Sequence, residues 1–330
     1  MSHSKIITLL HTCLLVIIIT QYSTAQNLNG IRIAIDPGHS AGTMAEAIVE
    51  KKYVVFKLDS VNLAKGLTDS IEIIEPNSTL VTALLLQQKL QAKGAEVLLS
   101  RTKQGYSSFD KPFAQWYAEK YLTTPTIVKK GNKKIRIPTE RKAFVNEFNV
   151  QDIAQRAKII NTYKPDITVI IHFNADEKNE PWTRPTNKNY NMIFVPTLAE
   201  NVDSVAQQFT PYASTASKNL LLAKTTIQAF EEVLKVPAAG VNDALYLKDK
   251  CEETSVKGVY VRQLALSKMV KGVVIYGETL YQDNYEECKL LNHKTLNING
   301  IAYSERIANV AEAYYQGIIN YYKILQNVIK

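Results

Sequence analysis

Four polar side chains stand at the ends of strongly apolar stretches of the sequence. They are His39, Glu75, His172 and Glu278, which end the stretches IRIAIDPGH, SIEIIE, ITVIIH and KGVVIYGE. Buried strands are apolar along their length, and ligands of α/β proteins gather at the carboxyl ends of such strands. Two histidines and one glutamate match a catalytic zinc site with one position open for water. Glu278 is then a candidate general base.

Residues of these types could together hydrolyse an amide bond. Zinc would polarise the carbonyl and lower the pKa of a water molecule toward about 7. Glu278 would take the water proton and deliver it to the leaving nitrogen. Asp36 and Asn174 lie close in sequence to the two histidines, so we expect them to orient the imidazoles. The chain has no HExxH motif, so spacing alone leaves a purely structural role open for each residue.

Strand-like stretches alternate with helical stretches along most of the chain. We expect strands at residues 31–36, 71–74, 96–100, 167–171, 192–195, 259–266 and 273–276. We expect helices near residues 80–92, 153–164, 220–234 and 307–321, the first with its N-cap at Asn77-Ser78-Thr79 and followed by Gly94. This alternation predicts an α/β fold with a mostly parallel central sheet flanked by helices.

The domain organisation predicted from the sequence is simple. With 330 residues, of which 46% are hydrophobic, the chain can bury one sizeable core. The sequence shows no internal repeat, low-complexity tract or linker, so one domain is more economical than two. We therefore expect a single catalytic domain over residues 26–330, with long insertions near residues 41–70, 103–150 and 177–215.

Residues 1–25 have the features of a secretory signal peptide. Lys5 precedes the apolar run Ile6–Ile19, and Ser23-Thr24-Ala25 is a small-x-small cleavage signature. An uncleaved anchor helix is the alternative, although the run is short for a membrane span. We expect cleavage and export to a periplasm or to the extracellular space and cell wall, with no stable membrane anchor afterwards.

The mature chain is basic and keeps two cysteines. Loss of Lys5 lowers the formal net charge from +8 to +7, which indicates an acidic partner or simply a solvated basic surface. Export argues against nucleic acid and favours a polymer rich in carboxylate or phosphate. Cys251 and Cys288 could pair in an oxidising compartment or remain two separate thiols.

The ordered motifs resemble the zinc-dependent N-acetylmuramoyl-L-alanine amidases, a family of cell-wall hydrolases with a phosphorylase/hydrolase-like α/β fold. The similar segments reach from Ile31 to Tyr322 in the family's order and are IRIAIDPGHS, EPNSTLVTALLLQQKLQAKGAEVLLSRT, QRAKIINTYKPDITVIIHFNA, GVVIYGETLYQDN and ERIANVAEAYYQGIINYY. The resemblance implies one Zn²⁺ ion bound by His39, Glu75 and His172, with Glu278 as the catalytic carboxylate. Further family positions are occupied by Asn284, Arg156 and Asn161, and for the last two we expect a role in anchoring a helix.

Two features depart from the family pattern. The DPGHS segment lacks the usual second glycine, and the gap between His39 and Glu75 is longer than the family norm. Glu72 is a rival ligand only three residues before Glu75. We prefer Glu75 because the following helix and Gly94 then fall in the family's register.

The resemblance implies cleavage of the amide between the lactyl group of N-acetylmuramic acid and L-alanine in peptidoglycan. In some members an inserted helix blocks the site until a protein activator displaces it, and residues 41–70 or 177–215 could act in this way. The segment Lys129–Lys142 holds seven basic residues and could be a wall-binding arm or a solvated hairpin. Two alternatives remain, a zinc amidase or peptidase acting on another amide, and a non-catalytic wall-binding regulator on the same scaffold.

Overall fold

The computed structural model describes residues 27–123, 128–130, 133–135, 137–197 and 214–329. The expected signal peptide, residues 1–25, lies outside the described residues, as does part of the insertion expected near residues 177–215. Across the described ranges, no helix is both long enough and apolar enough to cross a bilayer.

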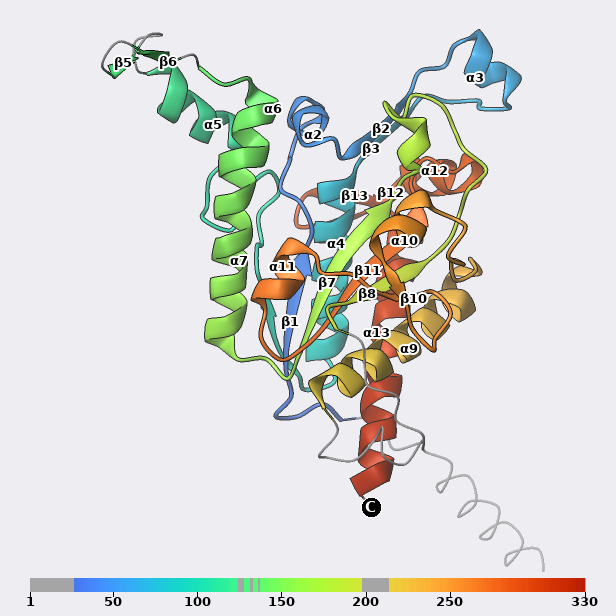
Figure 1. Ribbon diagram of the computed structural model, residues 1–330. Coiled ribbons are helices and arrows are strands. Elements are labelled where there is room, and N and C mark those ends of the chain that lie inside the picture. Colours follow the sequence, from blue (N-terminus) through green and yellow to red (C-terminus); the bar gives the residue numbers. More distant parts are fainter. Residues whose placement is uncertain (1–26, 124–127, 131–132, 136, 198–213, 330) are drawn as a thin grey trace, which may run out of the picture.

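A seven-stranded sheet forms the centre of the molecule (Figure 1). Its order is β4 (Glu96–Leu99), β1 (Arg32–Pro37), β7 (Ile167–Asn174), β11 (Val273–Tyr281), β8 (Met192–Val195), β10 (Val259–Val261) and β9 (Glu252–Glu253). The first four strands are mutually parallel, whereas β8 pairs antiparallel with β11, and β9 antiparallel with β10. The expected mostly parallel α/β sheet is thus confirmed.

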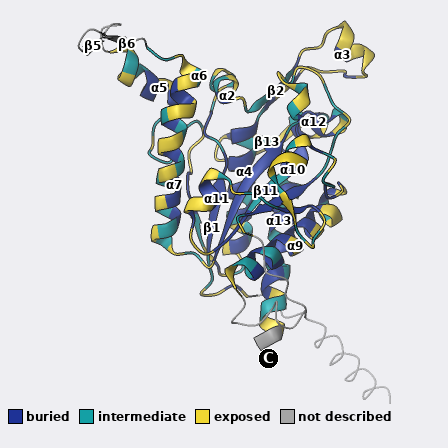
Figure 2. Cartoon of the chain, viewed as in Figure 1, coloured by how far each residue is buried: buried dark blue, intermediate teal, exposed yellow. Residues whose placement is uncertain are grey.

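Helices cover both faces of this sheet. Alternate residues of its central strands point to opposite sides, and apolar side chains on each side need to be covered. Ile35 and Val169 belong to the larger core, to which α4 (Glu75–Gln91), α9 (Thr215–Leu234) and α13 (Glu305–Ile329) also contribute. On the other side, Ala34 and Ile170 pack with residues of α7 and α11, which span Asn149–Tyr163 and Ala265–Met269. Figure 2 shows the buried sheet between helices whose outer surfaces are exposed.

The insertion at residues 41–70 is ordered and reaches the carboxyl end of β1. It contains α2 (Met44–Glu50), β2 (Tyr53–Phe56) and α3 (Ser60–Ala64). β2 pairs antiparallel with β3 (Ile71–Ile74), so the expected strand at 71–74 exists but lies outside the central sheet. This small sheet carries the chain from the insertion directly into α4.

The insertion at residues 103–150 forms an arm beside α7, visible at the upper left of Figure 1. It contains α5 (Phe113–Tyr117), the π-helical turns Ala118–Leu122 and Phe144–Phe148, and α6 (Glu140–Ala143). An aromatic cluster that includes Phe113, Trp116 and Phe148 forms its own small core. Within the basic segment, β5 (Val128–Lys130) and β6 (Lys133–Ile135) pair antiparallel, which agrees with the hairpin interpretation.

Several element boundaries differ from the expectations. α4 begins at Glu75 rather than after residues 77–79, because Pro76 fits a first helical turn and the Thr79 hydroxyl donates to Gly38 O instead of capping. The strand expected at 259–266 ends at Val261, and residues 265–269 are helical. β11 continues past Tyr276 because its pairing with β7 continues to Asn174.

Four short elements near the C-terminal half were not expected from the sequence. They are α10 (Leu245–Lys250), α12 (Tyr285–Asn292) and the hairpin of β12 (Lys294–Ile298) and β13 (Ile301–Ser304). Of the two alternatives for the cysteines, the structure has two separate thiols, because Cys251 and Cys288 are both free. Cys251 packs against the cluster around Met192 and Tyr260, whereas Cys288 is buried in the large core, so the two thiols belong to different parts of the fold.

Candidate metal centre

The turn that presents His39 is held by two buried arginines. Arg101 donates to the carbonyl oxygens of Pro37 and Gly38, each at 3.0 Å. Arg156 donates to Pro37 O at 2.6 Å and to His39 O at 2.7 Å. His39 itself has a left-handed backbone (φ 64°), which is uncommon for a residue other than glycine. These four hydrogen bonds stabilise that conformation at the end of β1. They also fix the backbone position from which the imidazole of His39 extends.

Three side chains converge at the carboxyl ends of β1 and β7 and at the start of α4. His39 Nε2 lies 3.1 Å from Glu75 Oε1 and 2.9 Å from His172 Nδ1. His172 Nδ1 lies 3.3 Å from the same carboxylate oxygen. Two imidazole nitrogens and one carboxylate oxygen are the donor set of many catalytic zinc sites, and this cluster could hold a metal ion. By their chemistry and convergence, the residues present fit Zn²⁺.

Glu50 orients His39, a role that the sequence did not reveal. Its Oε1 lies 3.0 Å from His39 Nδ1, and its Oε2 accepts from the backbone amides of Ser40 and Ala41 at 3.3 and 3.0 Å. Burial opposes ionisation, but His39 and these amides hold the pKa of Glu50 below its usual value. A carboxylate here favours a proton on Nδ1, which leaves the Nε2 lone pair facing Glu75 and His172.

The second oxygen of Glu75 is also held. Gln282 Nε2 donates to Glu75 Oε2 at 3.3 Å, and Lys52 Nζ lies 3.6 Å from that oxygen. Phe173 N donates to Oε1 at 3.3 Å. Burial raises the pKa of Glu75, but Lys52 and His39 outweigh it and keep the carboxyl ionised. Sequence reasoning missed both Lys52 and Gln282, although Gln282 lies within the motif YGETLYQDN.

His172 is fixed by close packing on two sides. Its ring stacks on Tyr276 with centroids 4.3 Å apart and planes 10° apart. On the other side, a Cβ atom added to Gly38 would lie 2.3 Å from His172 Cε1, so only glycine fits there. Burial and the nearby His39 lower the pKa of His172 to about 3. The ring is therefore neutral, which is the form of histidine that binds metals.

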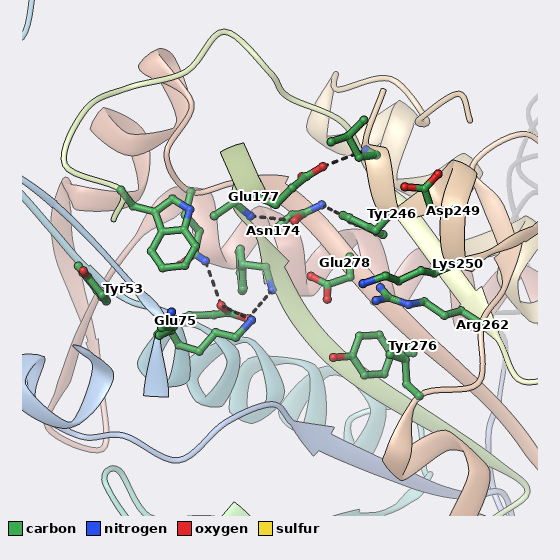
Figure 3. A pocket seen from close by; sticks show the side chains of 18 residues that line it. Tyr53, Glu75, Asn174, Glu177, Tyr246, Asp249, Lys250, Arg262, Tyr276 and Glu278 are labelled. Atoms are coloured by element: carbon green, nitrogen blue, oxygen red, sulfur yellow. Dashed lines mark hydrogen bonds and ion pairs between the residues drawn. The ribbon is translucent and has the colours of Figure 1, made fainter. Parts of the chain in front are cut away.

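Glu278 lies beside this cluster. β11 and β7 are paired in parallel with Glu278 opposite His172, so both side chains are on the same face of the sheet. Burial, reinforced by Glu75, raises the pKa of Glu278 to about 8, while Lys52 and His39 oppose the shift. In Figure 3 its carboxylate points into a cavity that Glu75 and Tyr246 also line. The group is thus a half-buried carboxylate that can exchange a proton near pH 7.

The two residues expected to orient the imidazoles do not do so. Asp36 accepts hydrogen bonds from Ser100 and Arg156, and Asn174 Nδ2 donates to Tyr246 Oη at 2.9 Å. Asn174 is two residues beyond His172 on the same side of β7, about 7 Å farther along the strand. Glu50 occupies the place that we expected Asp36 to fill.

The other family positions have structural contacts. Arg156 joins α7 to the His39 turn. Asn161 joins α7 to the C-terminal end of α11, because it donates to Met269 O and accepts from Lys271 N. Asn284 caps α12 by accepting from the amides of residues 286 and 287. Glu72 is an exposed residue of β3, whereas Glu75 is buried at the cluster.

Two cavities meet at the cluster. One, of about 500 Å³, is lined by Glu75 and Glu278. The other, of about 350 Å³, is lined by His39 and His172. Lys52 and Tyr276 line both. A long substrate could therefore cross the cluster and occupy a cavity on each side of it.

The fold and the site define an α/β protein with a His-Glu-His cluster and a free carboxylate at strand ends. The sequence matches the family model described as N-acetylmuramoyl-L-alanine amidase over residues 33–320, and the chain belongs to this family. It is therefore an amidase whose substrate class is peptidoglycan.

Solved structures of amidases are similar to this chain at low identity. The CwlD amidase from Clostridioides difficile, solved in complex with the GerS lipoprotein, is 17% identical, with 89% of this chain and 100% of that chain covered and a TM-score of 0.47. The apo form of Ami1 from Mycobacterium abscessus is 17% identical, with 89% and 99% covered and a TM-score of 0.46. AmiC2 of Nostoc punctiforme is 13% identical, with 89% and 99% covered and a TM-score of 0.46. No curated protein matches the chain.

Proposed function

We propose that this amidase is zinc-dependent and hydrolyses the bond between N-acetylmuramic acid and L-alanine, with His39, Glu75 and His172 as the metal ligands and Glu278 as the general base. One observation carries the proposal. His39 Nε2, His172 Nδ1 and Glu75 Oε1 converge within 2.9 to 3.3 Å of one another, and Glu278 lies opposite His172 in the strand register.

The mechanism divides the chemistry between the metal ligands and Glu278. Zinc held by the three ligands would supply a Lewis acid that polarises the amide carbonyl and activates water. Glu278 takes a proton as water attacks and returns it to the nitrogen of L-alanine as the amide breaks. Burial raises the pKa of Glu278 above its usual value, which makes its carboxylate a stronger base for the proton of the attacking water. Lys52 limits that rise, so that a useful fraction stays ionised at neutral pH.

Mass spectrometry of digested peptidoglycan tests the proposal. Purified peptidoglycan is incubated with the chain lacking residues 1–25, with added zinc and with chelator, and in parallel with Glu278→Gln. We expect release of intact stem peptides that carry a free L-alanine amine, in the zinc sample only. The same products from the Glu278→Gln protein would refute the role of Glu278, and their release in chelator would refute zinc dependence.

The insertion at residues 41–70 completes the site instead of blocking it, in our proposal. It supplies Glu50 to His39 and Lys52 to Glu75, and both residues lie at the cluster. A protein activator that displaces an inserted segment stays a prediction from the family resemblance. Export after cleavage of residues 1–25 is likewise proposed, and N-terminal sequencing of the protein from the cell envelope and medium tests it.

A further inference from the structure

Arg262 is a cation held in place by aromatic rings. It follows β10 directly, and its backbone amide donates to Val195 O at 3.0 Å. Its guanidinium carbon lies 4.8 Å from the ring centre of Tyr246 and 5.2 Å from that of Phe194. Within the described part of the chain, the guanidinium forms no hydrogen bond or ion pair with a protein group. Stacking on an aromatic face leaves the edge donors of arginine available for a ligand.

The guanidinium is directed into the cavity beside Glu278. Figure 3 shows Arg262 and Lys250, which come from different elements, both extending toward Glu278. Arg262 is close enough to Glu278 to favour its ionised form. Tyr246, which supports the guanidinium, is itself fixed by hydrogen bonds to Asn174 at 2.9 Å and to the sulfur of Met192 at 3.0 Å. The cation therefore has a defined position relative to the reacting amide.

The position of Glu278 decides which part of the substrate enters this cavity. Under the proposed function, Glu278 delivers its proton to the nitrogen of L-alanine, so that nitrogen lies on the Glu278 side. Glu278 lines only the larger of the two cavities, whereas His39 and His172 line only the smaller one. The peptide that leaves with L-alanine thus extends toward Arg262, and the sugar lies on the other side.

We infer that Arg262 is a specificity-determining residue that binds a carboxylate of the stem peptide, on the residue that follows L-alanine. The planar fork of an arginine pairs with a carboxylate through two parallel hydrogen bonds, and a carboxamide cannot accept both. Lys250 adds a second positive charge at the open side of the cavity. The inference rests on the proposed function, since it uses the direction of the substrate across the cluster.

Two muramyl dipeptides that differ only in one group test the inference. One carries glutamate with a free α-carboxylate after L-alanine, and the other carries isoglutamine, in which that group is a carboxamide. The side-chain carboxyl of both peptides is blocked as a methylamide, so that the residue carries no second carboxylate. We expect the wild type to prefer the carboxylate form. Arg262→Met should lose about 10- to 100-fold in kcat/KM on the carboxylate form, mainly through KM, and change little on the carboxamide form. Arg262→Lys should keep part of the preference. Lys248→Met is the matched control, an exposed residue of α10 outside the cavity.

Binding is measured as well, so that the inference does not depend on turnover. Calorimetry compares zinc-loaded Glu278→Gln with the zinc-loaded double variant that also carries Arg262→Met. The double variant should bind the carboxylate peptide about 10- to 100-fold more weakly and bind the carboxamide peptide with little change in affinity. Equal losses on both peptides, or an unchanged preference in Arg262→Met, would overturn the inference. Turnover of the carboxamide peptide by the wild type reports on the proposed function separately, because that activity does not need Arg262.

Discussion

Glu50 and His39 are joined through a 3.0 Å contact between Oε1 and Nδ1, and the carboxylate comes from the segment that lengthens the gap between His39 and Glu75. The other carboxylate oxygen of Glu50, Oε2, accepts from Ser40 N and Ala41 N, at the start of that segment. The inserted residues therefore fold back and contact His39, which precedes them in the sequence. The additional residues of this segment thus orient His39, which we propose as a metal ligand.

Glu50→Ala should weaken zinc binding by about 10- to 100-fold, because His39 would lose the partner that fixes its ring and tautomer. Glu50→Gln should have a smaller effect, since its carbonyl oxygen can still accept from Nδ1. Competition with a chromophoric chelator measures both affinities. Glu46→Gln is the matched control, because that carboxylate on the same helix binds Gly42 N instead. Equal zinc affinity in Glu50→Ala and the wild type would contradict the role of Glu50.

Glu75→Gln and Glu72→Gln should separate the ligand from its rival. Glu75 is buried with Oε1 between the two imidazoles, whereas Glu72 is exposed on β3. We expect Glu75→Gln to lose more than about 100-fold in zinc affinity, beyond the effect of removing an outer partner. Glu72→Gln should bind zinc like the wild type. The reverse ranking, measured by the same chelator competition, would assign the ligand to Glu72.

The fold was predictable to the extent that periodicity and apolar runs specify it. Central strands such as β7 and β11 begin with apolar runs, so the sequence located where each of them starts. Ile71–Ile74 has the same local appearance, yet it pairs with β2 of the insertion, and no local pattern distinguishes these two partners. The end of β11 was wrong for a related reason, because pairing with β7 extends a strand beyond its apolar part.

The sequence predicted the site residues that lie at the ends of apolar stretches. It did not predict those that reach the cluster from segments without such a pattern. Glu50 and Gln282 reach the cluster only through tertiary contacts, and neither spacing nor composition marks them. Asp36 and Asn174 were expected to contact the imidazoles because they are near in sequence. The geometry of a strand instead carries such neighbours to other partners, Arg156 and Tyr246 respectively.

Gly38→Ala should damage the site more than the fold. The added Cβ would lie 2.3 to 2.6 Å from the ring atoms of His172, and Tyr276 stacks on that ring and limits its retreat. We expect zinc affinity to fall by about tenfold or more, with the unfolding transition largely kept. Gly240→Ala is the control, since its Cβ would meet only Asp243 Oδ2 at 3.3 Å. Zinc binding equal to that of the control would show that the His172 ring has room to move.

The pH dependence of stability should reveal the half-buried carboxyl of Glu278. Its pKa is raised from 4.5 to about 8 in the folded chain, so ionisation costs folding free energy. The contribution is intact below about pH 4.5 and is lost as the pH rises through about 8. Glu278→Gln cannot ionise, so in zinc-free protein its stability relative to the wild type should increase from about pH 5 to about pH 9. Urea unfolding in the presence of chelator measures this difference.

Zinc should shift the pH dependence of this stability difference toward lower pH. A divalent cation beside Glu278 favours the ionised carboxylate, so its pKa should fall and the pH step in the stability difference should move below about 8. Glu72→Gln is the control, because Glu72 is exposed on β3 and lies outside the cluster. A stability difference for Glu278→Gln that does not change with pH without zinc would mean that Glu278 is not held in a desolvated position. An unshifted step with zinc would mean that the ion binds away from His172 and Glu75.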